Sequence, residues 1–481
     1  MENDSLEVKL KKWFGFKEFR MGQKEVIESV LDRRNAVAIL PTGSGKSLIY
    51  QFCGFSIKGM TLVVSPLLSL MDNQVMQMKR AGEKRVAALN SMSSFSERKY
   101  ISNHLSEYQF LFVSPEMLQS EWLIAKLKQL TIGLLVVDEA HCISQWGMDF
   151  RPDYLTLGTV RRNLNFPLTL ALTATATEKV VKDISHFLKL SDVETDIHFH
   201  DPNRENLFYQ VKESSRAEKD VILLALLQQY PMPGIIYFSS KAQAEAVRQL
   251  VKNHTSWRVD TYHADRTFED RNTIQHQFLE GNLDLICATT AFGMGINKSN
   301  IRSVIHYHLP NSLEEYLQET GRAGRDGKES IVTLLYAPSD FQFKMRKMRE
   351  TDLLNIPFHR LQQDKDLQQH LSDSDHAMLQ LILQKKMSEH EAKLLVKSRI
   401  QYKVEQLKKV KDFAETTFCK RKFLSNHFGH QLLDKPKWCC SSCQQNEAEF
   451  IRNLESGKEE QTQENNQASE WKEKLIYLFS L

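Results

Sequence analysis

The sequence predicts an α/β protein with two tandem parallel-sheet domains followed by a helical region. First, its 481 residues exceed what one hydrophobic core usually organises, so two or more domains are expected. Second, short β-branched runs alternate with amphipathic helical stretches from Asn35 to about Tyr336, which is typical of strand-helix-strand units around parallel sheets. Third, this alternation stops beyond Pro338, where polar helical sequence begins.

Two series of apolar runs predict the buried strands of the two sheets. The first series comprises Ala36–Leu40, Thr61–Ser65, Phe110–Val113, Leu134–Val137 and Leu168–Leu172. The second comprises Ile235–Phe238, Val259–Tyr262, Leu283–Ala288, Val304–Tyr307 and Ile331–Tyr336. A polar stretch from Asp201 to Glu205 separates the two series, so we expect domains at 1–205 and 206–340.

The remainder of the chain differs in composition. Phe341 to Glu415 is rich in Gln, Lys and Asp and is predicted to be helical, as part of a separate region at 341–446. The tail at 447–481 is dominated by Glu, Gln, Asn and Lys, so most of it is expected to be mobile.

Composition and charge exclude several classes of protein. With 41% apolar and 26% charged residues the chain can form sizeable cores, and no apolar run approaches the roughly 18 residues of a membrane-spanning helix. No secretory signal is recognised, so we expect a cytoplasmic protein. The net charge of +3 is far from that of a passive DNA-coating protein, so any affinity for nucleic acid must come from a local groove.

A phosphate-binding turn follows the first predicted strand. Gly43 and Gly45 let backbone N–H groups converge on phosphate oxygens, while Lys46 neutralises their charge. The Ser47 hydroxyl can ligate magnesium at a helix N-terminus. The general P-loop pattern has glycine where Leu40 stands, and a Gly-Ser turn with a chance lysine is the alternative. The predicted ATP-binding residues of this turn are Thr42, Gly43, Ser44, Gly45, Lys46 and Ser47.

Two acids end the strand around Leu134–Val137, at the edge where α/β sheets bind ligands. We expect Asp138 to hold magnesium and Glu139 to orient the attacking water and accept its proton. His141 is assigned to the same catalytic group. A solvated loop after a strand is the alternative, and the upstream P-loop argues against it.

A turn rich in arginine and glycine occurs in the second predicted domain. Arg322 and Arg325 follow an amphipathic segment that contains Gln318, a spacing suited to an arginine finger that faces another domain. We expect one of the two arginines to contact the γ-phosphate and assign all three residues to catalysis. A basic, glycine-rich surface turn is the alternative.

Together these motifs resemble those of superfamily-two helicases, and Phe14 to Gln23 narrows the resemblance to the RecQ family. That segment is similar to the family's adenine-recognition motif. The resemblance implies that Arg20 stacks on or flanks the base and that Gln23 hydrogen-bonds its edge. Without the resemblance, the segment indicates only the start of an amphipathic helix.

His141 to Tyr154 is similar to the family's aromatic-rich loop, which couples DNA binding to hydrolysis. Trp146 and Phe150 offer faces for unpaired bases, and Arg151 adds a phosphate or cation–π contact. The family usually has His where Met148 stands. An ordinary core cluster is the alternative, although the interspersed Gly, Asp, Arg and Pro favour a loop.

Ile286 to Lys298 resembles the family's motif that links the DNA backbone to the ATP site, with Asn297 in place of the usual Asp. Thr173 in one domain and Thr289 in the other are the DNA contacts that the resemblance implies. Tyr262-His-Ala-Asp265 matches a further motif of the family.

The seven cysteines are unevenly distributed: Cys53, Cys142 and Cys287 lie singly in apolar stretches and are predicted to be buried thiols. A late cluster indicates metal binding more than disulfides in a reducing compartment. It resembles the RecQ zinc-binding subdomain, and its predicted ligands are Cys419, Cys439, Cys440 and Cys443. Asn446 stands where the family has its last cysteine; His427 or His430 could compete with Cys439, and a metal-free hairpin is the alternative.

The resemblance implies two tandem RecA-like domains, a zinc-binding subdomain and 3′→5′ ATP-dependent DNA unwinding with ATP, Mg²⁺ and Zn²⁺. We expect a monomer of the short bacterial type, without winged-helix and HRDC modules and nucleoid-associated if bacterial. Its expected partners are single-stranded and partially duplex DNA, with single-strand-binding protein or other repair factors as further candidates. A DNA translocase or clamp with weak unwinding and an RNA-remodelling helicase are the alternatives.

Overall fold

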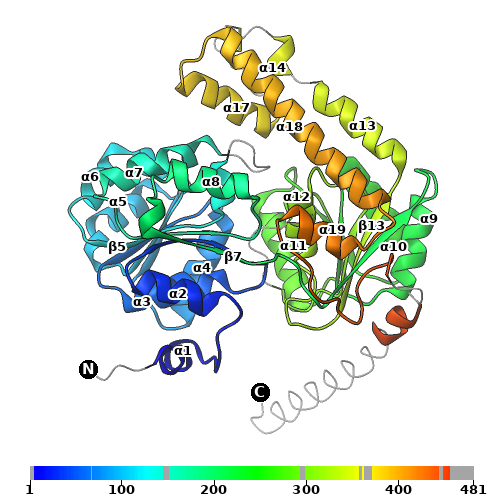
Figure 1. Ribbon diagram of the computed structural model, residues 1–481, viewed down its shortest axis with the longest axis horizontal. Helices are drawn as coiled ribbons and strands as arrows, with labels where there is room; N and C mark the ends of the chain where they lie inside the picture. The colour runs from blue at the N-terminus through cyan, green and yellow to red at the C-terminus, as the bar shows by residue number, and fades with distance from the viewer. Residues whose placement is uncertain are drawn as a thin grey trace. The chain divides into compact units, whose positions relative to one another are not determined.

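The computed structural model describes residues 5–66, 68–90, 92–144, 151–292, 298–350, 352–356, 360–361, 364, 371–443 and 448–454. The chain forms two compact units, each containing one sheet (Figure 1). The first unit comprises Met1–Asn203, Met345–Gln406 and His427–His430. The second comprises Arg204–Lys344, Leu407–Asn426 and Gln431–Leu481.

The first unit contains a seven-stranded parallel sheet with the order β3-β4-β2-β5-β6-β1-β7. Its strands are β1 (Asn35–Ile39), β2 (Met60–Val64), β3 (Val86–Leu89), β4 (Phe110–Val113), β5 (Ile132–Val137), β6 (Thr169–Thr173) and β7 (Thr195–Phe199). Because β5, β6 and β1 are neighbours, the turns that follow these three strands lie at one edge of the sheet.

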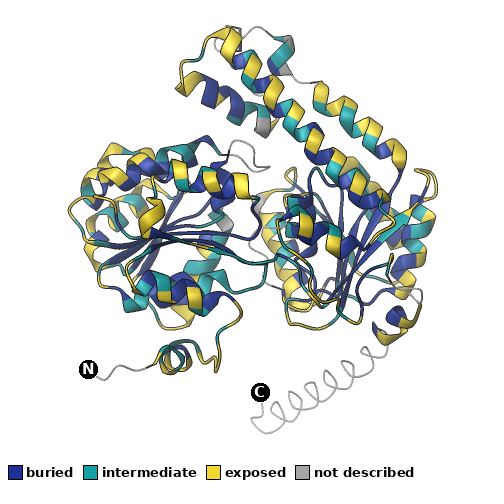
Figure 2. Ribbon diagram, viewed as in Figure 1, coloured by how far each residue is buried: buried dark blue, intermediate teal, exposed yellow. Residues whose placement is uncertain are grey.

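Both faces of this sheet are buried, which explains its continuous apolar runs. In β1, Val37 and Ile39 enter one core and Ala36 and Ala38 the other. One face is covered by α2 (Gln23–Leu31), α3 (Lys46–Ser56) and α4 (Leu68–Arg80). The other is covered by α6 (Glu121–Leu127), α7 (Leu157–Asn163) and α8 (Glu178–Phe187) (Figures 1 and 2).

The second unit contains a six-stranded parallel sheet with the order β10-β11-β9-β12-β13-β8. Its strands are β8 (Leu207–Glu213), β9 (Gly234–Tyr237), β10 (Val259–Tyr262), β11 (Leu285–Ala288), β12 (Ser303–His306) and β13 (Ser330–Tyr336). Its helices include α9 (Lys219–Gln229), α10 (Lys241–His254), α11 (Phe268–Glu280) and α12 (Leu313–Thr320). Leu223 of α9 and Val247 of α10 pack into the same core as Ile236 of β9.

The described residues beyond β13 are mainly helical. They include α13 (Pro338–Arg349), α14 (Asp352–Asn355), α17 (Asp373–Gln384), α18 (Glu389–Glu415) and α19 (Lys420–His427). Beyond α19, Cys440 forms an isolated parallel β-bridge with Tyr209 of edge strand β8. The Ser441 amide donates to the Tyr209 carbonyl oxygen (2.9 Å). No helix within the described ranges is long and apolar enough to cross a bilayer.

The predicted fold class is confirmed: two parallel-sheet RecA-like domains are followed by helices and a cysteine-bearing segment. The strands β3, β7 and β8, each of which forms one edge of its sheet, are not among the strands predicted from the sequence. In β7 and β8 polar residues such as Asp196 and His198 interrupt the apolar run, because an edge strand is less fully buried, whereas β3 is a short apolar run of four residues.

Candidate functional site

The phosphate-binding turn connects β1 to α3. Gly43 and Gly45 both adopt positive φ, at 83° and 78°, where a side chain would be strained. Gly45 caps α3, so Lys46 and Ser47 occupy the first helical turn, where free N–H groups favour an anion. The Lys46 amine donates to the Leu40 carbonyl oxygen (3.2 Å) at the end of the preceding strand. The turn therefore has the geometry of a P-loop.

Leu40, which replaces the usual first glycine of the P-loop, has a structural explanation. Its side chain is fully buried. A Cβ atom added to Gly22 would lie 2.5 Å from Leu40 Cδ2, so the leucine packs directly beneath the backbone of Gly22. Leu40 thus joins the P-loop to the segment that resembles an adenine-recognition motif.

Arg20 and Gln23, the predicted adenine contacts, both bind the P-loop. The Gln23 amide donates to the carbonyl oxygens of Ser44 (2.7 Å) and Gly45 (3.3 Å). Its oxygen accepts the Arg20 N–H (2.9 Å), and the Arg20 guanidinium donates to the Gly43 carbonyl oxygen. Gln23 is 2% exposed, whereas Arg20 is exposed. The exposed guanidinium is therefore the better placed of the two to meet a base.

Asp138 and Glu139 lie where β5 ends. The Asp138 amide donates to the Val64 carbonyl oxygen (2.9 Å), which aligns this end of β5 with β2. Glu139 adopts the left-handed conformation, with φ 47°, which is strained for a residue with a side chain. Burial, followed by the charge of Glu139, raises the pKa of Asp138 to about 7, while the charge of Lys46 lowers it. A divalent cation would favour the ionised form of Asp138 and therefore fits this position.

We call the turn that carries Asp138 and Glu139 the acidic turn. His141 links it to the end of β6. Its Nδ1 lies 2.9 Å from the Thr173 hydroxyl and 3.3 Å from the Glu139 carboxylate. The Thr173 hydroxyl is also hydrogen-bonded to the Thr175 carbonyl oxygen (3.2 Å). Both His141 and Thr173 are buried, so this chain of contacts is shielded from bulk water. A predicted catalytic residue and a predicted DNA contact are therefore in direct contact.

The aromatic-rich loop is described only at its ends. Trp146, Met148 and Phe150 lie outside the described residues. The Arg151 amide donates to the Cys142 carbonyl oxygen (3.1 Å), and the Arg151 guanidinium lies 3.8 Å from the Glu116 carboxylate.

Tyr154, which follows this loop, is not among the site residues predicted from the sequence. Its hydroxyl donates to the backbone carbonyl oxygen of Asp138 (3.0 Å), and its side chain is fully buried. The tyrosine therefore ties the exit of the loop to the acidic turn. Its place at the end of the aromatic-rich motif was the only sequence signal for this contact.

We call Gly321–Gly327 of the second unit the arginine turn; it follows α12, on which Gln318 is half-buried. Its two arginines differ in exposure. Arg322 is 5% exposed and hydrogen-bonds the hydroxyl of Tyr237, which in turn donates to the Phe292 carbonyl oxygen (2.8 Å). Arg325 is half-buried. Arg325 is therefore the more available of the two to a ligand.

Thr289, a predicted DNA contact, follows β11 and is half-buried. Its amide donates to the Tyr262 carbonyl oxygen (3.1 Å), and its carbonyl oxygen accepts the Phe292 amide (2.9 Å). Asn297 lies outside the described residues.

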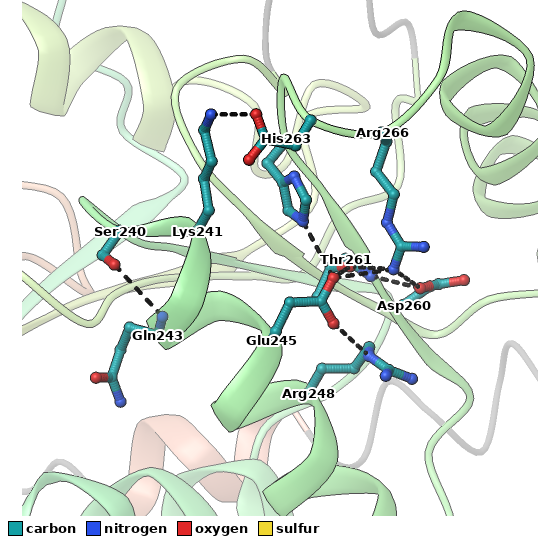
Figure 3. A network of polar contacts seen from close by, with 10 residues as sticks. Ser240, Lys241, Gln243, Glu245, Arg248, Asp260, Thr261, His263 and Arg266 are labelled. Atoms are coloured by element: carbon teal, nitrogen blue, oxygen red, sulfur yellow. Dashed lines mark hydrogen bonds and ion pairs between the residues drawn. The ribbon is translucent and has the colours of Figure 1, made fainter.

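Glu245 of α10 binds His263 of the Tyr262–Asp265 motif and the two residues that flank the motif, Thr261 and Arg266 (Figure 3). The Glu245 carboxylate accepts hydrogen bonds from Thr261 (2.7 Å), His263 (3.0 Å) and Arg266 (3.0 Å). Burial opposes ionisation, but the hydrogen bonds from Thr261, His263 and Arg248, together with the charge of Arg266, lower the pKa of Glu245 to about 2. This carboxylate therefore stays charged and ties α10 to the loop after β10.

The four late cysteines gather at one point of the second unit. Their sulfur atoms all lie within 4.8 Å of one another, with Cys419 at 3.5 Å from Cys439 and 4.0 Å from Cys440. Thiolates bound at about 2.3 Å to a tetrahedral zinc ion lie about 3.8 Å apart, so the spacing fits zinc. Cys443 is the most exposed of the four, and its sulfur accepts a hydrogen bond from Lys435 (3.5 Å).

The cluster contains Cys439, the residue proposed to replace the family's last cysteine. Asn446, which stands at that cysteine's position, lies outside the described residues. Within the described ranges the metal-competent group consists of the four cysteines and includes neither His427 nor His430. The ring of His430 instead packs against Phe199 (4.7 Å between centroids).

Two family models match the chain: DEAD/DEAH box helicase at residues 20–184 and helicase conserved C-terminal domain at residues 218–327. It is 37% identical over 358 residues to the ATP-dependent DNA helicase RecQ of Haemophilus influenzae. It is also 41% identical over 456 residues to the probable ATP-dependent DNA helicase RecS of Bacillus subtilis, a match covering 91% of this chain and 92% of RecS. The chain belongs to the RecQ family.

The relatives of this RecQ-family chain differ in length. The match to the Haemophilus RecQ covers 73% of this chain and 57% of that protein. Among solved structures, the DUF1998 helicase MrfA bound to DNA has a TM-score of 0.59, with 19% identity and coverage of 72% of this chain and 54% of MrfA. At that identity the similarity shows the fold alone.

Proposed function

We propose that this RecQ-family chain is an ATP-dependent DNA helicase that moves 3′→5′ along single-stranded DNA and unwinds duplex DNA in repair or recombination. The observation that supports it best is the adjacency of β5, β6 and β1, whose ends carry Glu139, Thr173 and Lys46. The match to RecS over nearly its whole length supports DNA as the polymer.

The P-loop residues and Glu139 have different roles in ATP hydrolysis. Lys46 neutralises the β- and γ-phosphates, and the N–H groups at the start of α3 bind their oxygens. Glu139 orients the attacking water and accepts its proton. Ser47 and Asp138 would hold magnesium, which supplies positive charge to the phosphate oxygens. Arg20 and Gln23 recognise the adenine.

Coupling to DNA requires that the two domains, proposed at 1–205 and 206–340, move relative to each other. Arg322 or Arg325 contacts the γ-phosphate during the ATP cycle, and loss of that phosphate releases the contact. Trp146, Phe150 and Arg151 stack on and hold unpaired DNA. The contact of Tyr154 with Asp138 supports a connection between that loop and the hydrolytic acids.

Zinc bound by Cys419, Cys439, Cys440 and Cys443 would stabilise the proposed subdomain at 341–446. Thiolate ligands at tetrahedral spacing bind zinc strongly enough to contribute directly to folding. The proposed active form is a monomer bound to single-stranded or partially duplex DNA, with single-strand-binding protein or other repair factors as partners.

The test combines ATP hydrolysis with strand displacement. Hydrolysis should rise at least about tenfold with single-stranded DNA, because a motor responds to its track. A 3′-tailed DNA duplex should be unwound and a 5′-tailed one should not. Hydrolysis without displacement would indicate a translocase or clamp, and equal displacement of RNA would indicate an RNA remodeller. Turnover indifferent to polynucleotide would refute the proposal.

A further inference from the structure

The arginine turn is held by a residue from a distant part of the second unit. The Arg204 guanidinium donates to the carbonyl oxygens of Gly321 (3.1 Å) and Ala323 (2.8 Å). It also donates to the carbonyl oxygen of Gly324 and to the side chain of Asn206 (3.2 Å). One planar cation therefore binds three backbone oxygens of the segment that carries Arg322.

Asn206 holds the same turn from two residues farther along. Its amide donates to the carbonyl oxygens of Gly324 (2.8 Å) and Lys328 (2.7 Å). Gly324 has φ 56°, and a Cβ atom added there would lie 2.5 Å from the Asn206 amide nitrogen. The turn therefore approaches Asn206 so closely that it needs glycine at this point.

The arginine turn has further supports within the second unit. Arg302 binds both carboxylate oxygens of Asp326 at 2.6 Å, and the Gly324 amide donates to the Ile301 carbonyl oxygen (2.8 Å). Arg302 is 5% exposed, so its guanidinium is largely shielded from water, whereas Asp326 is exposed. With one group of contacts at Gly321–Gly324 and another at Gly324–Asp326, the backbone on both sides of Arg325 is fixed.

The backbone of Arg204 is itself fixed by Arg421. The Arg421 guanidinium donates to the carbonyl oxygens of Arg204 (2.8 Å), Leu207 and Cys439 (3.3 Å). Its side chain is fully buried and lies over the ring of Tyr209, 5.0 Å from the centroid. A buried guanidinium held by neutral carbonyls costs desolvation energy, so its contacts must be specific. Arg204 is therefore anchored at its main chain while its side chain reaches the turn.

We propose that Arg204 is a positioning residue for ATP hydrolysis: it holds the arginine turn so that Arg325 meets the γ-phosphate. This inference rests on the proposed function of the chain. A displacement of about 1 Å in a group that stabilises a transition state can cost roughly a hundredfold in rate. Lysine at this position would keep the charge but lose the planar fork that binds several carbonyl oxygens at once.

The first test compares Arg204→Lys with Arg258→Lys. Arg258 also makes several hydrogen bonds, to Asp284 and to the Gly281 carbonyl oxygen, but it is exposed and far in sequence from the arginine turn. Arg204→Lys should lower DNA-stimulated kcat by about 10- to 100-fold. KM for ATP and Kd for single-stranded DNA should change by less than about twofold, because the proposed arginine contact stabilises the transition state and not bound ATP or DNA. The control should match the unmodified chain.

The second test is a double-mutant cycle that separates positioning from general destabilisation. If Arg204 acts through Arg325, Arg204→Lys should have little further effect on kcat in an Arg325→Ala background. Asn206→Ala removes two hydrogen bonds from the same turn and should give a smaller loss of kcat that vanishes in the same background. This variant tests the proposal independently if Arg204→Lys does not fold.

Unchanged kcat in a folded Arg204→Lys variant, or additive effects of the two substitutions, would overturn the inference while leaving the proposed function intact. Failure of the proposed function would be recognised differently: the unmodified chain would not hydrolyse ATP in response to DNA. That result would overturn the proposed function, and the inference with it.

Discussion

The two domains share a parallel α/β architecture but place their functional residues differently. In the first, the P-loop follows β1 and the acidic pair follows β5, while Thr173 is the last residue of β6. In the second, the arginine turn follows helix α12; the side chains of Arg204 and Asn206 bind its backbone, and Arg302 binds the Asp326 carboxylate.

This difference separates two ways of building a site. Sheet order and register place the first domain's groups, because parallel strands bring their carboxyl ends together. Hydrogen bonds from sequence-distant side chains place the second domain's arginines. Substitutions of the strand-end groups of the first domain should therefore act mainly at the residue that is changed, although Gln23 and Tyr154 also bind the turns there. Substitutions in the second domain can act through a neighbour that holds the arginine turn.

The largest expected effect is that of Lys46→Ala. Removing the cation that neutralises the phosphates should lower ATP turnover by at least about a thousandfold, with unchanged thermal unfolding. Steady-state hydrolysis with single-stranded DNA measures the loss. Lys24→Ala, which removes an exposed ion pair with Glu7 in the same domain, is the control and should have little effect. Retained hydrolysis in Lys46→Ala would contradict the assignment of the P-loop.

Substitutions of Arg322 and Arg325 should have different effects on stability, because the two arginines differ in burial. Arg325→Ala is expected to lower turnover by about a hundredfold or more with little change in Tm, because Arg325 is half-buried. Arg322→Ala should also lower Tm, since Arg322 is buried against Tyr237. Hydrolysis and thermal unfolding of the same preparations test this contrast. Equal losses of Tm in both variants would show that burial does not distinguish them.

The cysteine cluster tests whether the second unit depends on a metal. Protein purified without added zinc should contain about one equivalent, and Cys443→Ser should reduce this content and destabilise the protein by roughly 2 kcal/mol. Metal analysis and chemical denaturation measure these quantities. Cys53→Ser, a buried thiol of the first unit, should leave the zinc content unchanged. Less than half an equivalent in the unmodified chain would favour the metal-free hairpin.

The smallest expected effect is a pH dependence at Asp138, whose pKa is raised from its ordinary 3.8 to about 7 by burial and by the charge of Glu139. Between those values the folded protein binds a proton that the unfolded chain has released, so stability should fall as pH rises from about 4 to about 7. Without ATP or magnesium, Asp138→Asn should be more stable at about pH 8 by roughly 1 to 2 kcal/mol, and the gain should vanish near about pH 4.

Denaturation curves across this pH range measure the effect at Asp138. Asp265→Asn serves as the control, because Asp265 is exposed and its pKa is lowered by the hydrogen bond from Lys241. It should give no gain in stability at high pH. If the free energy of unfolding varied with pH in the same way in Asp138→Asn and in the unmodified chain, burial would not raise the pKa of Asp138.

Local sequence signals were sufficient for the central strands and for the position of the P-loop. Val37 and Ile39 alternate with Ala36 and Ala38 between two cores, and that double burial is visible as an uninterrupted apolar run. The same signal fails at β7, where only part of the strand is buried. A strand that is buried on both faces is therefore visible in the sequence, whereas a partly exposed strand such as β7 is not.

The sequence by itself determined the fold class, the family and the motifs, because periodicity, glycine spacing and strand-end acids are properties of neighbouring residues. Only the tertiary structure decided which distant groups meet. Arg204 contacts Gly324, and the sulfur atoms of Cys439 and Cys419 lie close together, because the order of the strands and the path of the chain bring these residues together. No local pattern carries that information, since a hydrogen bond depends on distance and direction in space and not on separation along the chain.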